Sequence, residues 1–240
     1  MLKTERMDRV RAALRAQGLT QMIVCDPKSV WYLTGVAVEP YERLLALYLP
    51  TEGEPVLFLN RLFNVPEPPC RTVWHTDTDK PVAQIAEVVD AGKPLGIDKE
   101  WPAKFLIPLM ETHPGMQVVL SSDCVDDCRA CKDAEEQALM REASRINDAV
   151  NEAAKHYIKA GMTEREVAEF IDAQYRAHGC EGPSFTTIVS FGANAADPHH
   201  EPDDTVLKEG DCVLFDMGCV KSRYCSDMTR TWFCGQPTEK

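Results

Sequence analysis

Three side chains in the last third of the chain have types and spacing that fit hydrolytic chemistry. Asp216 follows the apolar run 213–215, Asp227 lies eleven positions later, and His199 precedes Asp216 by seventeen positions. Glycine and polar residues separate the two aspartates, so the chain can reverse between them. Two neighbouring antiparallel strands would then bring both carboxylates together.

A pair of buried carboxylates repels unless the two groups share a proton or bind a cation. Oxygen ligands suit hard divalent ions such as Mn²⁺, and also Co²⁺ or Zn²⁺. Two metal ions bridged by such a pair can activate a water for hydrolysis. A second interpretation stays open at this point. A single Asp at a strand end is commonly a turn or capping residue, and a His after a proline is commonly a loop residue.

The second half of the chain predicts two helices followed by strands. Asp133 with Glu136, and Thr163 with Glu166, have the spacing of capping boxes, which mark helix starts. The apolar periodicity predicts that these helices end near residues 161 and 179. Strand-like runs follow at residues 185–191, 212–217 and 224–233. This order predicts an α+β domain over residues 133–240.

The first half alternates strand and helix signals instead. Helical spacing marks the segment around Met7, Val10 and Leu14, which Gly18 would end, and a second helix is predicted at residues 81–89. A third helix is expected between residues 98 and 117. Short apolar runs predict strands at residues 22–25, 44–49, 56–59, 95–98 and 117–120. The alternation predicts a three-layer α/β domain over residues 1–125, and the polar segment 121–132 is the expected boundary.

Composition excludes several classes of protein. The chain has 240 residues and a net charge of −12, which argues against binding a polyanion such as nucleic acid. No apolar run is long enough for a membrane span, and the charged N-terminus does not resemble an export signal. We therefore expect a cytoplasmic protein whose ten cysteines are reduced. Cys124, Cys128 and Cys131 form a second candidate metal site, for zinc, but free thiols are the favoured interpretation because a fourth ligand is missing.

The order of motifs in the second half resembles the pita-bread metallopeptidases, the family of X-Pro aminopeptidases (aminopeptidase P) and X-Pro dipeptidases (prolidases). The matching segments are residues 161–164, 184–189, 192–196, 198–199, 216–218 and 226–231. The first half is similar to the creatinase-type N-terminal domain that precedes the catalytic domain in this family. The resemblance thus covers nearly the whole chain.

The resemblance implies a role for each matching residue. Asp216 corresponds to a bidentate ligand of one metal ion, and Asp227 to the ligand that bridges two. His199 corresponds to the histidine that hydrogen-bonds the substrate near the scissile bond. From its position beside His199, and not from the resemblance, His200 is a further candidate for the substrate entrance, although a solvated loop residue is the favoured interpretation. The implied reaction is hydrolysis of the peptide bond before a proline, with two divalent metal ions, Mn²⁺ foremost, as cofactors. Proline-containing peptides are the implied substrates, and a homodimer is the implied assembly.

One departure from the family pattern affects the functional expectation. The family takes three further metal ligands, a His and two Glu, from the region after the strand that corresponds to residues 226–231. Lys240 lies nine residues beyond Thr231. We therefore expect a truncated pita-bread domain and a fragment that is inactive alone. Two alternatives remain: a catalytically dead module that binds peptides or proteins, and a creatinase-like amidinohydrolase that works without metals. The sequence does not distinguish aminopeptidase from dipeptidase activity.

Overall fold

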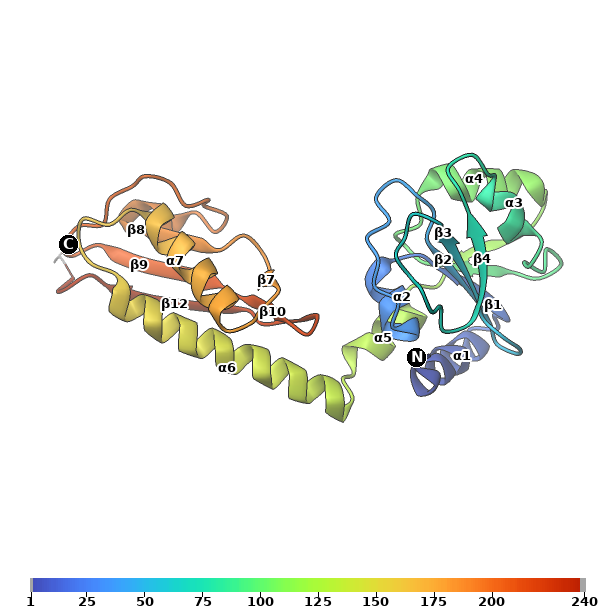
Figure 1. Cartoon of the computed structure of the whole chain (residues 1–240), viewed down its shortest axis with the longest axis horizontal. Helices are drawn as coiled ribbons and strands as arrows, with labels where there is room; N and C mark the ends of the chain where they lie inside the picture. Colours follow the sequence, from blue (N-terminus) through green and yellow to red (C-terminus); the bar gives the residue numbers. More distant parts are fainter. Residues whose placement is uncertain (1, 238–240) are drawn as a thin grey trace. The chain divides into compact units, whose positions relative to one another are not determined.

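A computed structural model describes residues 2–237, which form two compact units (Figure 1). One unit ends at Cys131 and the other begins at Lys132. The first unit contains two clusters of buried apolar side chains and the second contains one. No helix among the described residues combines the length and apolar character needed to cross a bilayer.

The first unit is built on one six-stranded sheet with the strand order β4-β3-β2-β1-β5-β6. Its central strand β1 pairs antiparallel with β2 and parallel with β5, and all four of its residues are buried. In chain order the elements are α1 (Thr4–Ala16), β1 (Gln21–Val24), α2 (Pro27–Thr34), β2 (Ala46–Pro50), β3 (Val56–Asn60), β4 (Arg71–His75), α3 (Pro81–Ala86), β5 (Leu95–Ile97), α4 (Ala103–Thr112), β6 (Val118–Leu120) and α5 (Asp123–Ala130).

Helices cover both faces of this sheet. Successive strand residues point to opposite faces. Met22 and Val24 accordingly belong to the core cluster that contains Leu14 of α1, while Ile23 belongs to the cluster that contains Leu109 of α4. The predicted three-layer α/β architecture is therefore confirmed.

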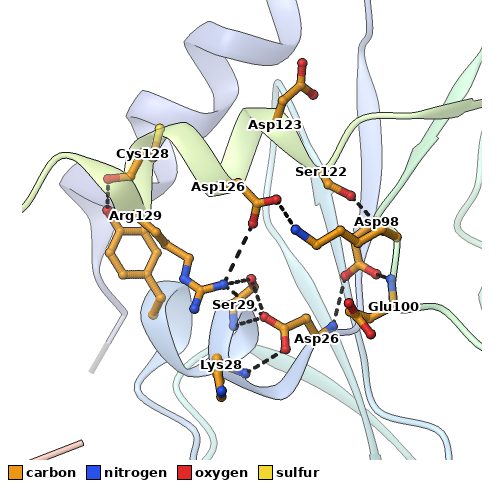
Figure 2. Close-up of polar contacts among 12 residues, drawn as sticks. Asp26, Lys28, Ser29, Asp98, Glu100, Ser122, Asp123, Asp126, Cys128 and Arg129 are labelled. Carbon is orange, nitrogen blue, oxygen red and sulfur yellow. Dashed lines mark hydrogen bonds and ion pairs between the residues drawn. The ribbon is translucent and has the colours of Figure 1, made fainter. Parts of the chain in front are cut away.

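Charged side chains connect the residues after β1 and after β5 to helix α5 (Figure 2). Asp26 follows β1 and caps α2 by accepting a hydrogen bond from the Ser29 backbone N–H at 2.9 Å. Arg129 of α5 donates to Asp26 Oδ2 at 3.1 Å and to Ser29 Oγ at 3.0 Å. Lys99, after β5, pairs with Asp126 of α5. The segment 121–132, expected to be a polar boundary, thus contains the helix α5, which is bound to the first unit, and the two units divide at the end of this segment.

The second unit contains two helices and two three-stranded sheets, with the strand orders β12-β9-β8 and β11-β10-β7. Its elements are α6 (Ala134–Tyr157), α7 (Glu164–Ala177), β7 (Gly182–Pro183), β8 (Ile188–Phe191), the 3₁₀ helix η1 (Gly192–Ala196), β9 (Cys212–Met217), β10 (Cys219–Lys221), β11 (Tyr224–Cys225) and β12 (Met228–Phe233). The predicted α+β order is confirmed.

Both predicted capping boxes are present. The Asp133 carboxylate accepts a hydrogen bond from the Glu136 backbone N–H at 2.9 Å, and the Glu136 carboxylate accepts one from the Asp133 N–H at 2.9 Å. Thr163 and Glu166 make the same reciprocal pair at the start of α7. These hydrogen bonds satisfy backbone donors that have no partner inside a helix. The sequence therefore located both helix starts through local chemistry.

The strands of this unit are shorter and more numerous than predicted. The run at residues 185–191 forms a strand only from Ile188 onwards. The run at residues 224–233 is divided between β11 and β12, and β11 pairs with β10. Ser222 and Arg223 have φ values of 50° and 67°, so they form the tight turn between β10 and β11. The sequence did not predict this turn, because neither residue is a glycine, the residue type that usually marks positive φ.

Candidate metal and substrate site

Asp216 lies on β9, between two strands that are both antiparallel to it. Burial alternates along β9: Val213, Phe215 and Met217 are buried in the core, while Asp216 is half-buried on the opposite face. Thr229 of β12 lies directly across from Asp216, and its hydroxyl donates to Asp216 Oδ1 at 2.8 Å. The antiparallel reversal expected between the two aspartates is therefore present.

Asp227 directly precedes β12. Extending the β9–β12 register by one pair places Asp227 across from Gly218, two residues along the chain from Asp216. Asp227 is exposed, and within residues 2–237 it makes no hydrogen bond or ion pair. It borders an open hollow of about 400 Å³, which is also lined by Asp148 and Asn147 of α6. The two aspartates are thus less buried than the sequence implied, so solvent relieves part of their repulsion.

Buried polar side chains of α6 and α7 hold the end of β9 through hydrogen bonds. The Asn147 side-chain amide donates to the Met217 carbonyl at 3.0 Å, and the Tyr175 hydroxyl donates to Asn147 Oδ1 at 2.5 Å. Burial raises the pKa of the Tyr175 hydroxyl well above its usual range, so this donor keeps its proton. The sequence predicted an apolar face on α6 and missed Asn147, because an amide at a helical core position has no distinct pattern.

His199 lies in the loop that follows η1 and is exposed. Its backbone N–H donates to Asp197 Oδ1 at 2.9 Å. The neighbouring His200 points into the unit instead, where its Nε2 lies 2.6 Å from Glu164 Oε2. The side chain of His200 is 14% exposed and that of Glu164 is completely buried. The two adjacent histidines therefore have different environments.

Glu164, His200 and Asp203 are the one group of three or more candidate metal-ligating side chains in residues 2–237 whose ligand atoms all lie within 4.8 Å. This group contains none of His199, Asp216 and Asp227. The sequence missed Glu164 as a site residue. The available signal was a glutamate directly after the helix cap Thr163, within one of the matching segments.

The cysteines do not form a second metal centre in the described residues. All ten are free, and the thiols of Cys124, Cys128 and Cys131 do not converge within 4.8 Å of one another. Burial raises the pKa of the Cys124 thiol to about 11, with the nearby Asp123 adding to the shift. The free-thiol interpretation of this cluster is therefore favoured.

Comparison with known proteins finds a matching family for each of the two units. Residues 138–240 match the sequence model of metallopeptidase family M24. Residues 6–131 match the model of the creatinase/prolidase N-terminal domain. Over 235 residues the chain is 31% identical to an uncharacterized peptidase of Staphylococcus epidermidis; the match covers 96% of this chain. The chain spans 66% of the length of that relative.

Two solved structures share the fold of the whole chain. A prolidase from Thermococcus sibiricus has a TM-score of 0.90 at 29% identity, covering 99% of this chain and 67% of the prolidase. Dipeptidase PepE from Mycobacterium ulcerans has a TM-score of 0.88 at 30% identity, covering 98% of this chain and 65% of the dipeptidase. The second unit therefore has the pita-bread fold, preceded by a creatinase-type domain.

Proposed function

Because the chain belongs to metallopeptidase family M24 and carries its creatinase/prolidase N-terminal domain, we propose that it is a polypeptide of a metal-dependent peptidase that hydrolyses X-Pro bonds. An X-Pro bond is a tertiary amide without an N–H group. A peptidase that grips this N–H of its substrate fits such a bond poorly, so a dedicated site is needed. The prolidase from Thermococcus sibiricus, similar along the whole chain, supports this substrate class.

The observation that carries the proposal is the β9–β12 pairing, which brings Asp216 and Asp227 to neighbouring positions. Within residues 2–237 neither carboxylate has a cationic partner, and Asp227 has no polar partner at all. Such carboxylates suit hard divalent cations. We assign Asp216 and Asp227 as the residues that would hold the divalent ions, with Mn²⁺ as the expected metal. When bound, the ions supply a Lewis acid and an activated water.

His199 is the residue that we assign to the substrate. An exposed imidazole can donate a hydrogen bond to the scissile carbonyl, where negative charge develops during attack. His200, which the sequence placed at the substrate entrance, is already bonded to Glu164. We therefore assign His200 to holding the loop rather than to binding peptide.

Asp216 and Asp227 supply at most four oxygen atoms, too few to complete the coordination of two metal ions. The family resemblance implies a His and two Glu beyond the strand at residues 226–231. We propose that residues 1–240 by themselves do not hydrolyse X-Pro peptides, and that the active enzyme is a homodimer. We place it in the cytoplasm, where its ten free thiols would stay reduced.

Metal binding tests this assignment directly. Titration of the full protein with Mn²⁺ in a calorimeter is expected to show binding that Asp227→Asn weakens by about tenfold or more, since a ligand is lost. Asp148→Asn is the matched control, because Asp148 lines the same hollow from α6. Its affinity is expected to stay near that of the wild type. Equal affinity in wild type and Asp227→Asn would remove Asp227 from the site.

The intact mass of the natural gene product decides which polypeptide to assay for hydrolysis. That product, loaded with Mn²⁺, is expected to cleave X-Pro peptides faster than matched X-Ala peptides. Cleavage by residues 1–240 alone at the same rate would contradict the proposed need for further ligands. An absence of both metal binding and cleavage would favour a peptide- or protein-binding module.

A further inference from the structure

The carboxylate of Glu164, at the start of α7, has four hydrogen-bond partners. Oε1 accepts from the Phe191 backbone N–H at 2.7 Å and from Asn194 Nδ2 at 3.0 Å. Oε2 accepts from His200 Nε2 at 2.6 Å and from the Asp203 backbone N–H at 3.2 Å. A carboxylate only accepts hydrogen bonds, so the contact with His200 is a hydrogen bond when the imidazole presents its N–H at Nε2. All four donors lie between the end of β8 and residue 203, on both sides of His199.

Beyond η1, the segment that these bonds restrain has no regular secondary structure of its own, apart from one bridge between Val206 and Thr163. Residues 197–206 contain no helix or extended strand, and residues 197–199 are exposed. The first turn of α7 adds two backbone bonds, from Glu164 N–H to the Thr205 carbonyl at 3.2 Å and from Arg165 N–H to the Asp203 carbonyl at 3.1 Å. The start of α7 is therefore the main attachment of the loop that carries His199.

Stability alone does not explain a carboxylate at this position. A fully buried carboxyl group is costly, and its hydrogen bonds mainly offset that cost. Packing apolar side chains against the helix would hold two elements together at least as well. What four directed hydrogen bonds add is one defined conformation for the groups that they join. Glu164 spans both flanks of His199, so it defines where the intervening residues lie.

We propose that Glu164 is a positioning residue that orients His199 for the substrate by holding the 192–206 loop through Asn194, His200 and the Asp203 backbone. This inference rests on the proposed function, in which His199 contacts the peptide. It further assigns the Glu164, His200 and Asp203 group to loop positioning rather than to metal binding, since both oxygen atoms of Glu164 are occupied by N–H donors.

A double-mutant cycle tests the proposal in the full, metal-loaded protein. Glu164→Gln keeps the side-chain volume but turns an amide N–H₂ towards donors, so two of the four bonds are lost. Its kcat/KM for an X-Pro peptide is expected to fall to within about threefold of that of His199→Ala, mainly through kcat. The double variant should lose no more than about a further twofold, because both changes remove one interaction.

The matched control is Glu166→Gln, in the same helical turn. Glu166 is exposed and bonds Thr163, not the loop, and glutamine preserves that capping bond. Its kcat/KM is expected to stay within about twofold of the wild type. Full additivity of Glu164→Gln and His199→Ala in the cycle would overturn the proposal, since a general loss of stability acts independently of His199.

Amide hydrogen exchange supplies a readout that needs no activity. Glu164→Gln is expected to speed exchange at residues 197–205 while β9 keeps its protection, and Glu166→Gln should change neither. If the wild type cleaves no X-Pro peptide, the proposed function fails. The exchange data and the His199 imidazole NMR signal then decide the inference, and an unchanged loop and signal in Glu164→Gln overturn it. If Glu164→Gln does not fold, Asn194→Ala removes one donor and should give the same pattern with smaller effects.

Discussion

Tyr175 is the largest fully buried side chain in the described part of the chain, and its hydroxyl supports the candidate site from inside. It donates to Asn147, which donates to the Met217 carbonyl directly after Asp216. This chain of bonds connects α7, α6 and β9. Helical periodicity accounts for the burial of Tyr175, because it lies on the same side of α7 as the buried Val167 and Ile171. The role of its partner Asn147 could not be predicted, since this role depends on which strand packs against α6.

Tyr175→Phe is expected to destabilise the second unit by about 1–3 kcal/mol, because Asn147 loses the donor to its buried oxygen. Tyr157→Phe is the matched control. Tyr157 stacks on Phe170 at a centroid distance of 3.9 Å, and within residues 2–237 its hydroxyl makes no hydrogen bond. It should change stability by less than about 0.5 kcal/mol. Urea unfolding measures both, and similar losses in the two variants would contradict a specific role for the Tyr175 hydroxyl.

The same hydroxyl gives a pH dependence with a defined sign. Burial raises the pKa of Tyr175 in the folded state, so the folded chain holds this proton when the unfolded chain has lost it. The contribution of Tyr175 to stability is complete below the unfolded pKa of about 10 and is lost as the pH rises above that value. Unfolding free energy between pH 9 and 11 should therefore fall less steeply in Tyr175→Phe than in the wild type. Equal slopes in the two proteins would show that folding does not raise the pKa of Tyr175.

At the scale of elements, the approach of β9 to the segment before β12 depends on Gly218. A Cβ built at Gly218 would overlap the backbone oxygen of Ser226 and the hydroxyl of Ser184. Ser226 is held there by its N–H bond to the Cys219 carbonyl at 2.9 Å. Since Asp216 and Asp227 flank this contact, Gly218 controls how closely their strands approach.

Gly218→Ala is expected to cost about 1–3 kcal/mol of stability, because a backbone atom cannot yield to the added methyl group. It should also weaken Mn²⁺ binding, because displacing the two segments separates the aspartates. Gly92→Ala is the control, since the nearest atom to its Cβ is Asp90 Oδ1 of a side chain, at 3.3 Å. Unfolding and calorimetric titration measure both effects. Wild-type affinity in a folded Gly218→Ala protein would contradict the link between this contact and the site.

Elements were predictable where the signal was local. The capping boxes at Asp133 and Thr163, and the central strands of the first unit, were found from a few adjacent residues. Helix α5 was missed because half of its eight residues are charged, and only Cys124 and Val125 are buried. Its attachment through Arg129 depends on residues about a hundred positions earlier. Such long-range partners leave no periodic pattern in the sequence.

At the scale of the whole molecule, the division between Cys131 and Lys132 separates two sets of buried side chains. The first unit has core clusters on both faces of its sheet, and the second has one core between its helices and sheets. Each unit thus has the kind of core that defines a domain. The comparisons with other proteins divide the chain at nearly the same point, with matches to residues 6–131 and 138–240.

Residues 1–131 expressed alone are therefore expected to fold. Their two core clusters need no residue of the second unit, so unfolding in urea should remain a single cooperative transition. Circular dichroism in the near ultraviolet, from Trp31, Trp74 and Trp101, reports packing within this unit. The longer chain is the control, in which Trp232 is the tryptophan of the second unit. A non-cooperative transition in residues 1–131 would show that the unit depends on its neighbour.

The sequence by itself determined the two-part architecture, the helix starts, the central strands, the order of the motifs around His199, Asp216 and Asp227, and the resemblance to the family. These features depend on residue type and on neighbours within a few positions. Only the tertiary structure decided that Thr229 lies opposite Asp216, that Asn147 supports β9, and that Glu164 is buried among donors from the His199 loop. These contacts join residues from 13 to 70 positions apart. They depend on strand register and helix packing, which are properties of the whole folded unit.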